Sequence, residues 1–303
     1  SPYEYRMVRG IDFYNVVLDD LESRSNVDFR TERVIKIRDF PGHAEVESER
    51  TVYEGTWVFD SRFLPEEYTE RKEKSRDAGR GAYHYLMQHF LGWEIETESP
   101  AFDPRTVTLF DFRTPQKGEM RFMYTLPFSE HRALVEFTLF SADLLEDAEY
   151  VSALESYLNE LIGLESYRVT GREKGVIPMT DEPFPRRLGD RVLAIGTKGG
   201  RVKASTGYAF HRVQQDTAAI VASLARNGHP FGLPRSPRGF QTLDTMLLQI
   251  MYRRGELSEP VFTCLFSRNP IQRLLRFLDE ETGILETMAV MATVPWGPFI
   301  RAW

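Results

Sequence analysis

Residues 195–210, with the sequence IGTKGGRVKASTGYAF, constrain the fold more than any other segment of the chain. The apolar run RVLAI at residues 191–195 predicts a short buried strand before this segment, and a helix is predicted after it over residues 208–227. A strand that leads through glycines into a helix can direct backbone N–H groups and the positive helix end at an anion. The glycines match neither the G-x-G-x-x-G nor the Walker pattern, so the residues alone leave two interpretations: a site for a phosphate-bearing cofactor, or an ordinary loop.

The middle of the chain predicts an antiparallel sheet, because runs with alternating or β-rich composition follow one another, with Pro or Gly between several of them. The four runs are YHYLMQHFLGWEIET, TVTLFDFRT, MRFMYTLPF and RALVEFTLFS, between residues 83 and 141. A helix over residues 146–164 and a returning strand over residues 167–176 are predicted next.

The flanking parts mix helices with short strands. An amphipathic helix is predicted over residues 9–25, strands over residues 26–40, and another strand at residues 57–59. The charged residues 65–81 predict a surface linker. Further helices are predicted at residues 243–254 and 270–278.

Composition limits the class of partner. The 303 residues carry a net charge of -7 without a long basic run, which disfavours nucleic acid because phosphate neutralisation needs clustered Lys and Arg. The single cysteine, Cys264, excludes a disulfide within the chain and fits a reducing compartment. No apolar run approaches the roughly 18 residues needed to cross a bilayer. The histidines show no metal-ligand pattern, so we expect no metal site.

The order of these elements resembles two-part flavoproteins of the hydroxybenzoate-hydroxylase type. In that group a late strand, a glycine-containing turn and a helix close the cofactor site, and an earlier strand ends near Asp-x-Arg, as residues 59–62 do here. Many of those proteins have Gly-Asp at the late turn, whereas this chain has Gly196 and Thr197. That difference points to a subgroup.

The subgroup that the chain resembles is the flavin-dependent lycopene cyclases of carotenoid synthesis. Their late turn has the pattern I-G-x-x-G-G-x-V-x-x-S-T-G-Y-x-F, which residues 195–210 fit throughout. Three further segments agree: FLGWEIE at residues 90–96, the G-x-I-P-M-T element at residues 175–180, and FMYTLPFSEHRALVEFT at residues 122–138.

The resemblance implies an α/β (α+β) fold with a Rossmann-like FAD-binding domain, an antiparallel-sheet substrate domain and a C-terminal helical region. We expect residues 1–62 and 186–230 to form the FAD-binding part, residues 63–185 the sheet domain and residues 231–303 the helical region. The family's first strand and G-x-G-x-x-G loop do not occur before Arg9, so the FAD-binding domain is expected to be incomplete in this chain.

The resemblance also implies reduced FAD as cofactor and NAD(P)H as its reductant. The residues expected to contact the flavin are Gly196, Thr197, Gly199, Gly200, Ser205, Thr206, Gly207 and Tyr208. Ser205, Thr206 and Gly207 would lie at the isoalloxazine end, at the start of the following helix.

The implied reaction is redox-neutral closure of the lycopene end groups to β-ionone rings, which needs a strong acid beside an apolar slot. A carboxyl whose pKa is raised by apolar surroundings can supply the proton. Glu136 is the first candidate, because it lies in the apolar strand LVEFT and matches the first acidic position of the family motif. The family often has a second acid next, where this chain has Phe137, so Glu136 acts alone or with another acid.

Three other carboxyls are candidates for the same chemistry. Glu94 and Glu96 alternate with apolar residues and point to one side of a strand, and Asp111 lies between two phenylalanines. Glu136, Glu94 and Glu96 have an alternative interpretation as solvent-facing side chains, and Asp111 is the weaker candidate.

The substrate that the family implies, lycopene or a related carotene, dissolves in membranes. We therefore expect a cytoplasmic protein with peripheral membrane contact. Its C-terminal tail MATVPWGPFIRAW is a candidate interfacial anchor, through Trp296, Phe299, Ile300 and Trp303, or else it packs on the protein.

Two other functions stay open at this point. One is a flavin-dependent monooxygenase or oxidoreductase acting on an apolar substrate. The other is a truncated, flavin-free protein that binds an apolar ligand through its antiparallel sheet.

Overall fold

The computed structural model describes residues 5–77, 83–234 and 237–302, and it has the mixed α and β architecture that the sequence predicts. The chain divides into two compact units. One holds the chain up to Phe59 together with Leu188–Leu193, and the other holds Asp60–Arg187 and the chain from Ala194 onward. The candidate site residues named above all lie in the second unit.

The first unit consists of one helix and a small meander. Helix α1 spans Gly10–Glu22 and has no buried residue. Strands β1 (Val34–Phe40), β2 (His43–Ser48) and β3 (Val52–Gly55) form an antiparallel sheet in that order. The predicted strands over residues 26–40 are therefore only partly correct, since residues 26–33 form no strand.

Helix α2 (Pro65–Asp77) replaces the predicted linker, and that prediction was wrong. Proline at the first helical position and Glu66 and Glu67 in the first turn suit a helix N-terminus, as basic residues in the last turn suit its C-terminus. The helix is held by one buried residue, Tyr68, whose hydroxyl donates a hydrogen bond of 2.6 Å to the carbonyl oxygen of Leu86. Charged residues of α2 add contacts with other elements, such as the 3.1 Å ion pair of Arg71 with Glu182, and the charged composition does not reveal these contacts.

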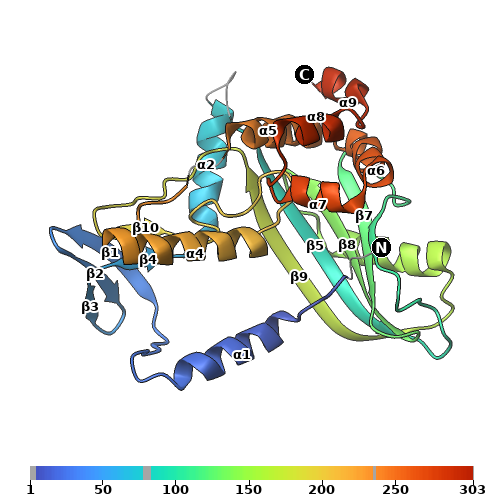
Figure 1. Ribbon diagram of the computed structural model, residues 1–303. Coiled ribbons are helices and arrows are strands. Elements are labelled where there is room, and N and C mark those ends of the chain that lie inside the picture. Colours follow the sequence, from blue (N-terminus) through green and yellow to red (C-terminus); the bar gives the residue numbers. More distant parts are fainter. Residues whose placement is uncertain (1–4, 78–82, 235–236, 303) are drawn as a thin grey trace. The chain divides into compact units, whose positions relative to one another are not determined.

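The second unit is built on a five-stranded antiparallel sheet, which confirms the predicted sheet (Figure 1). The strand order is β6-β7-β8-β5-β9. The strands are β5 (Tyr85–Glu96), β6 (Thr108–Asp111), β7 (Met120–Pro127), β8 (Arg132–Ser141) and β9 (Arg168–Thr180).

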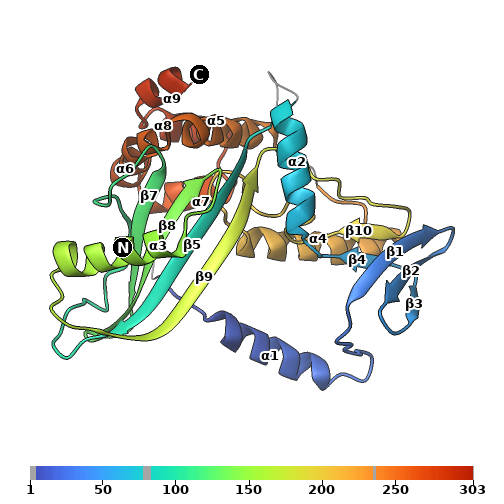
Figure 2. The same cartoon turned by 180° about the vertical axis from the view of Figure 1, so that it is seen from behind.

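One face of this sheet, the α3 face, packs on the helix that connects β8 to β9 in the sequence. Helix α3 (Asp147–Ser156) continues into a π-helical turn (Tyr157–Ile162), and Figure 2 shows α3 lying across the sheet. Because side chains alternate along a strand, Trp93, Val135 and Phe137 all point to this face and join one apolar cluster with Tyr150 of α3.

The opposite face, the α5 face, packs on C-terminal helices. Its residues Leu86, Phe122 and Phe140 form a cluster with Leu248 of α5 (Arg238–Arg254) and Phe262 of α6 (Ser258–Arg268). Both helices lie at one end of the sheet with the helices that follow them (Figure 1). The remaining elements of this part are the 3-10 turn Gly255–Leu257, α7 (Ile271–Leu278), α8 (Ile284–Met291) and α9 (Trp296–Ala302).

The glycine-rich segment connects strand β10 to helix α4. Strand β10 (Val192–Ala194) pairs with β4 (Val58–Asp60), and α4 spans Phe210–Asn227. Gly228 ends α4 with φ of 70°, a left-handed conformation that favours glycine. The predicted strand, turn and helix are therefore confirmed.

Candidate active site

The glycine-rich turn closes much of its backbone on itself. The N–H groups of Gly199, Gly200 and Arg201 donate hydrogen bonds of 3.0 Å to the carbonyl oxygens of residues 195, 197 and 196. Helix α4 starts only at Phe210. The expected row of free N–H groups at a helix N-terminus is therefore only partly present, because three of these donors are used inside the turn.

Two glycines of the turn are required by space. A Cβ atom on Gly207 would lie 2.1 Å from Oε1 of Gln88, and Gly207 also has φ of 72°. A Cβ atom on Gly199 would lie 2.6 Å from the carbonyl oxygen of Ala194. Since Gln88 is on β5 and Ile177 of β9 is also near Gly207, the turn packs directly on the α5 face of the sheet.

A buried ionic network fixes the second half of the turn. The Lys203 ammonium lies 2.9 Å from Asp244 of α5 and 2.8 Å from Glu280, which also binds Arg212 at 2.6 Å. The Ser205 hydroxyl donates a hydrogen bond of 2.5 Å to Asp244. Ser205 is thus committed to this network. Lys203, Asp244 and Glu280 could not be recognised from the sequence, because their spacing along the chain leaves no local pattern.

The Asp-x-Arg element lies beside the turn. Asp60 accepts a 2.8 Å hydrogen bond from Nε of Arg62 and lies 3.6 Å from the Lys198 ammonium. Its carbonyl oxygen accepts a 3.0 Å hydrogen bond from the N–H of Ile195. Burial acts to raise the pKa of Asp60, but the hydrogen bonds from Arg62 and the charge of Lys198 outweigh it and lower the pKa. The Asp-x-Arg element and the glycine-rich turn, two separate motifs in the sequence, are therefore in contact in the structure.

The turn borders a cavity of about 600 Å³. Thr197, Gly199 and Gly200 line it, together with Glu182 and Arg212. Among the described residues, Oε2 of Glu182 and Nε of Arg212 are buried without a hydrogen-bond partner. The lining contains both acidic and basic side chains, so the cavity suits a polar ligand.

The other half of the turn faces different surroundings. Ser205 and Thr206 line a separate apolar space of about 50 Å³ between the turn and the C-terminal helices. The Thr206 hydroxyl is buried and, within the described part of the chain, has no hydrogen-bond partner. Tyr208 is half exposed. The eight predicted flavin contacts are thus close in the chain but do not line a single cavity.

Glu136 occupies the α5 face of the sheet. It lies on β8, opposite Gly92 of β5 and Tyr124 of β7, and it is partly buried. The Thr138 hydroxyl donates a hydrogen bond of 2.5 Å to its Oε1. Burial raises its pKa to about 7, the Thr138 hydrogen bond opposes this rise, and the nearby Glu173 carboxylate adds to it. Glu136 therefore holds a proton in a substantial fraction of molecules near neutral pH.

The turn and Glu136 share this face. Gly207 packs against Gln88, and Gly92, opposite Glu136, is four residues further along β5 on the same side. At the rise of an extended strand this separation is about 13 Å. Phe90 lies between the two positions. An acid and the glycine-rich turn are therefore brought to one surface.

Glu94 and Glu96 point to one side of β5, as expected, but each faces an arginine. Glu94 lies 3.5 Å from the Arg132 guanidinium, and Glu96 accepts a hydrogen bond from Arg168. Both carboxyl groups are partly exposed. This setting favours Glu136 over the pair as an acid.

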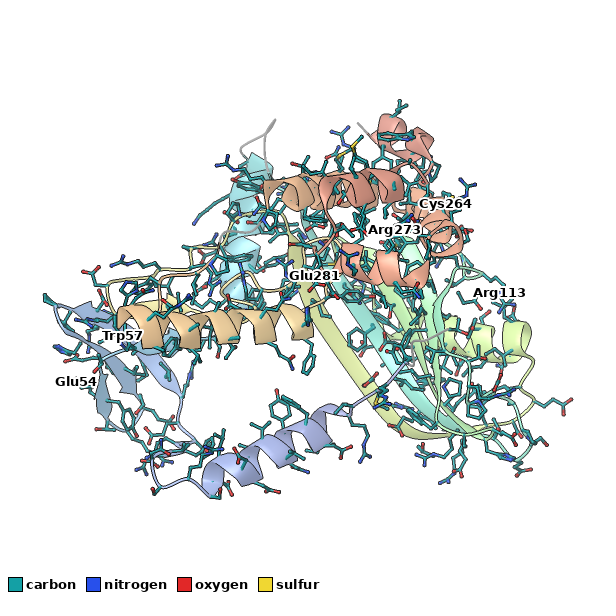
Figure 3. All side chains as sticks on the ribbon, viewed as in Figure 1. Glu54, Trp57, Arg113, Cys264, Arg273 and Glu281 are labelled. Carbon is teal, nitrogen blue, oxygen red and sulfur yellow. The ribbon has the colours of Figure 1, made fainter. Side chains whose placement is uncertain are left out.

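Asp111 is on the other side of the sheet from Glu136. It binds the Arg113 guanidinium, and it accepts a 2.9 Å hydrogen bond from the hydroxyl of Tyr157, a residue of the α3 face. Burial acts to raise its pKa, but these hydrogen bonds lower it overall. Figure 3 shows Arg113 near α3, away from Glu281 beside α7. Asp111 and Glu136 therefore do not form one site.

Comparison with known proteins agrees with the sequence pattern. The family model described as Lycopene cyclase protein matches residues 1–302. Lycopene beta-cyclase of Paracoccus sp. (strain N81106 / MBIC 01143) is 33% identical over 250 residues, which are 74% of this chain and 62% of that protein. Chloroplastic neoxanthin synthase of Solanum tuberosum is 30% identical over 199 residues, which are 62% of this chain and 37% of that protein.

The chain therefore spans less than two thirds of the length of these curated relatives. Among solved structures, the flavin-dependent brominase Bmp2 aligns with a TM-score of 0.48 at 13% identity, covering 98% of this chain and 74% of that one. In the described part of the chain, no helix has the length and apolar character needed to span a bilayer. Nor do its His, Cys, Asp and Glu side chains form a group of three or more suited to a metal.

Proposed function

Because the chain belongs to the lycopene cyclase family, we propose that it closes the end groups of lycopene, or of a related carotene, to β-ionone rings. The reaction is a redox-neutral isomerisation, and Glu136 supplies its first proton. The observation that carries this proposal is a partly buried carboxyl, with a pKa raised to about 7, on the same sheet face as the glycine-rich turn.

The proposed reaction begins with a proton transfer. The Glu136 carboxyl gives its proton to the terminal alkene, the neighbouring double bond attacks the resulting carbocation, and the ring cation then loses a proton. A carboxyl with a pKa near the working pH suits this step, because it is both protonated and acidic enough.

The surroundings of Glu136 suit an apolar, cationic reaction path. Phe90, Tyr124 and Leu134 are half-buried neighbours on the same face, at or next to the register of Glu136 and Gly92. Aromatic faces attract cations through their quadrupole, so Phe90 and Tyr124 would stabilise positive charge on the polyene.

The turn residues fit the flavin end of reduced FAD, with NAD(P)H as the proposed reductant. Thr197, Gly199 and Gly200 would contact it along the 600 Å³ cavity, with Gly196 next to them in the chain, and residues 205–208 would contact it beside β5. The buried hydroxyl of Thr206 and Oε1 of Gln88 are without hydrogen-bond partners among the described residues, and the polar edge of a flavin would supply them. When bound, the reduced flavin supplies electrostatic or acid–base assistance without net oxidation of the substrate.

We propose peripheral membrane contact from the cytoplasm through the C-terminal helices. Trp296 and Ile300 of α9 are exposed, whereas Phe299 packs on the core; Trp303 lies outside the described residues. Helix α8 adds an apolar surface that the sequence analysis missed: Ile284, Leu285 and Met288 are 80%, 82% and 63% exposed. The double variant Ile284→Ser/Leu285→Ser should float less with liposomes than a Leu144→Ser control, and equal flotation would contradict this surface.

The test of the proposed reaction uses the full-length protein with lycopene liposomes, FAD and NADPH under anaerobic conditions. The wild type should form a β-ring product, and Glu136→Gln should form it about 10²–10⁴-fold more slowly while binding flavin equally well. Ring closure at the wild-type rate in Glu136→Gln would reject the acid assignment. If the wild type binds reduced flavin and forms no ring, the cyclase proposal fails; oxygen consumption coupled to a product would instead support the oxidoreductase alternative.

A further inference from the structure

A second carboxyl lies in the same row of the sheet as Glu136. Across the strands the row contains Tyr124 of β7, Glu136 of β8, Gly92 of β5 and Glu173 of β9. Directly opposed residues of antiparallel strands project to the same face, so Glu136 and Glu173 both belong to the α5 face. One glycine separates them.

Gly92 leaves the space through which Glu173 reaches toward Glu136. A Cβ atom on Gly92 would lie 2.8 Å from Cγ and 3.1 Å from Oε1 of Glu173, and 3.1 Å from Cδ1 of Leu134. The Glu173 side chain therefore lies across the glycine rather than out from the sheet edge. Its carboxyl comes near enough to that of Glu136 to raise the pKa of Glu136.

The two carboxyls differ in their access to water. Glu136 is partly buried on a central strand, whereas Glu173 is exposed on the edge strand β9. The cations next to Glu173 in the chain point to the other face: Arg172 lies over the Trp93 ring, and Lys174 lies over the Tyr150 ring. Further along the α5 face, Arg132 is paired with Glu94, and Arg168 is paired with Glu96.

We propose that Glu173 is the second carboxyl of this site, sharing a proton with Glu136 and carrying protons between it and solvent. The inference rests on the proposed cyclase function and deepens it. Glu173 is a positioning residue, because it acts through Glu136. Phe137, the next residue in the chain, could not hold a second acid on this surface, since its side chain belongs to the α3 face.

The protons gained and lost in one ring closure balance. The O–H bond of Glu136 breaks as a C–H bond forms at the terminal alkene, and the neighbouring double bond supplies the electron pair of the new C–C bond. The ring cation loses one proton to solvent, and one proton returns from solvent through Glu173 to Glu136. No electron is gained or lost.

The first test is Glu173→Gln, which removes the charge and keeps the shape. Without the neighbouring carboxylate, Glu136 should ionise at lower pH, so the alkaline limb of the pH–rate profile should move down by about one pH unit. Glu98→Gln, another exposed glutamate, should leave the limb where it is. Glu173→Asp, which keeps a carboxylate, should bring the limb part of the way back to its wild-type position.

The second test separates the carboxyls without removing either of them. Gly92→Ala should push the Glu173 side chain aside and move the limb in the same direction as Glu173→Gln. The matched control is Gly171→Ala on the same strand pair, where the new Cβ would meet only the Glu94 side chain, at 3.3 Å.

An infrared titration of the Glu136 carboxyl, identified by its loss in Glu136→Gln, gives a readout that needs no turnover. A downward shift of this titration in both Glu173→Gln and Gly92→Ala supports the carboxyl pair, even if the protein closes no ring. An unchanged titration in Glu173→Gln overturns the pair, even if the protein proves to be a cyclase.

Discussion

The two faces of the five-stranded sheet each hold a carboxyl that the sequence marked as a candidate acid. Asp111 on the α3 face has a lowered pKa, whereas Glu136 on the α5 face has a pKa raised to about 7. Burial acts in the same direction on both, since it disfavours the charged form. Burial acts more strongly on Glu136, and the donors around Asp111 outweigh its burial, whereas the Thr138 hydrogen bond does not outweigh that of Glu136.

Asp111 accepts hydrogen bonds from two donors, and one of them, Arg113, is a cation. Glu136 accepts a hydrogen bond from the Thr138 hydroxyl and faces the carboxyl of Glu173. Near neutral pH the first group is an anion fixed in an ion pair, and the second is poised to give up a proton. Burial of a carboxyl alone does not identify an acid.

The largest expected contrast is in turnover. Glu136→Gln should lower the rate of ring closure by about 10²–10⁴-fold, the usual contribution of a general acid. Asp111→Asn should keep the rate within about threefold of the wild type, because it lies on the other face. Product formation under saturating flavin measures both, and a comparable loss in Asp111→Asn would remove the distinction between the faces.

A second contrast is in stability. Arg113→Gln should lower the free energy of unfolding by about 1–2 kcal/mol at pH 7, because the nearly buried Asp111 carboxylate loses a charged donor. The folded-state pKa of Asp111 is lowered, so this stabilisation exists above the unfolded pKa and disappears as the pH falls through the folded-state pKa.

Urea unfolding of Arg113→Gln and wild type at pH 7 and at strongly acidic pH measures this difference. The two proteins should converge at acidic pH. A loss that persists there would mean that Arg113 acts by packing rather than by charge.

The smallest expected effect is in the pH profile of Thr138→Val. Removing the hydroxyl that favours the Glu136 carboxylate should raise the pKa, so the alkaline limb should move up by about 0.7 pH unit, since one such bond is worth roughly 1 kcal/mol. The direction is opposite to that expected for Glu173→Gln. Shifts of the same sign in both variants would contradict the assigned causes.

Much of this arrangement could be predicted from local pattern. The alternation of apolar and polar residues predicted the strand that holds Glu136 with its observed bounds, Arg132–Ser141. The glycine-rich turn was also predicted in its place between a strand and a helix. Charged composition misled in α2, because only Tyr68 is buried and the other tertiary contacts are made by charged residues such as Arg71 and Lys72.

The partners of the site could not be predicted in the same way. Glu173 meets Glu136 only through the pairing of β8, β5 and β9, and Lys203 meets Asp244 and Glu280 across the fold. Such contacts depend on strand register and helix packing, which leave no periodic signal in the chain. The closed hydrogen bonds of the turn likewise depend on its backbone dihedrals.

The central claim is that an acid in exchange with solvent, Glu136, starts ring closure by proton transfer. Anaerobic turnover of lycopene in D₂O, with product analysed by mass spectrometry, tests this claim most directly. The account predicts that each newly closed ring carries one solvent-derived deuterium in the wild type and that Glu136→Gln forms labelled product about 10²–10⁴-fold more slowly. Rings formed in D₂O without deuterium, or labelled product formed equally fast by Glu136→Gln, would contradict it.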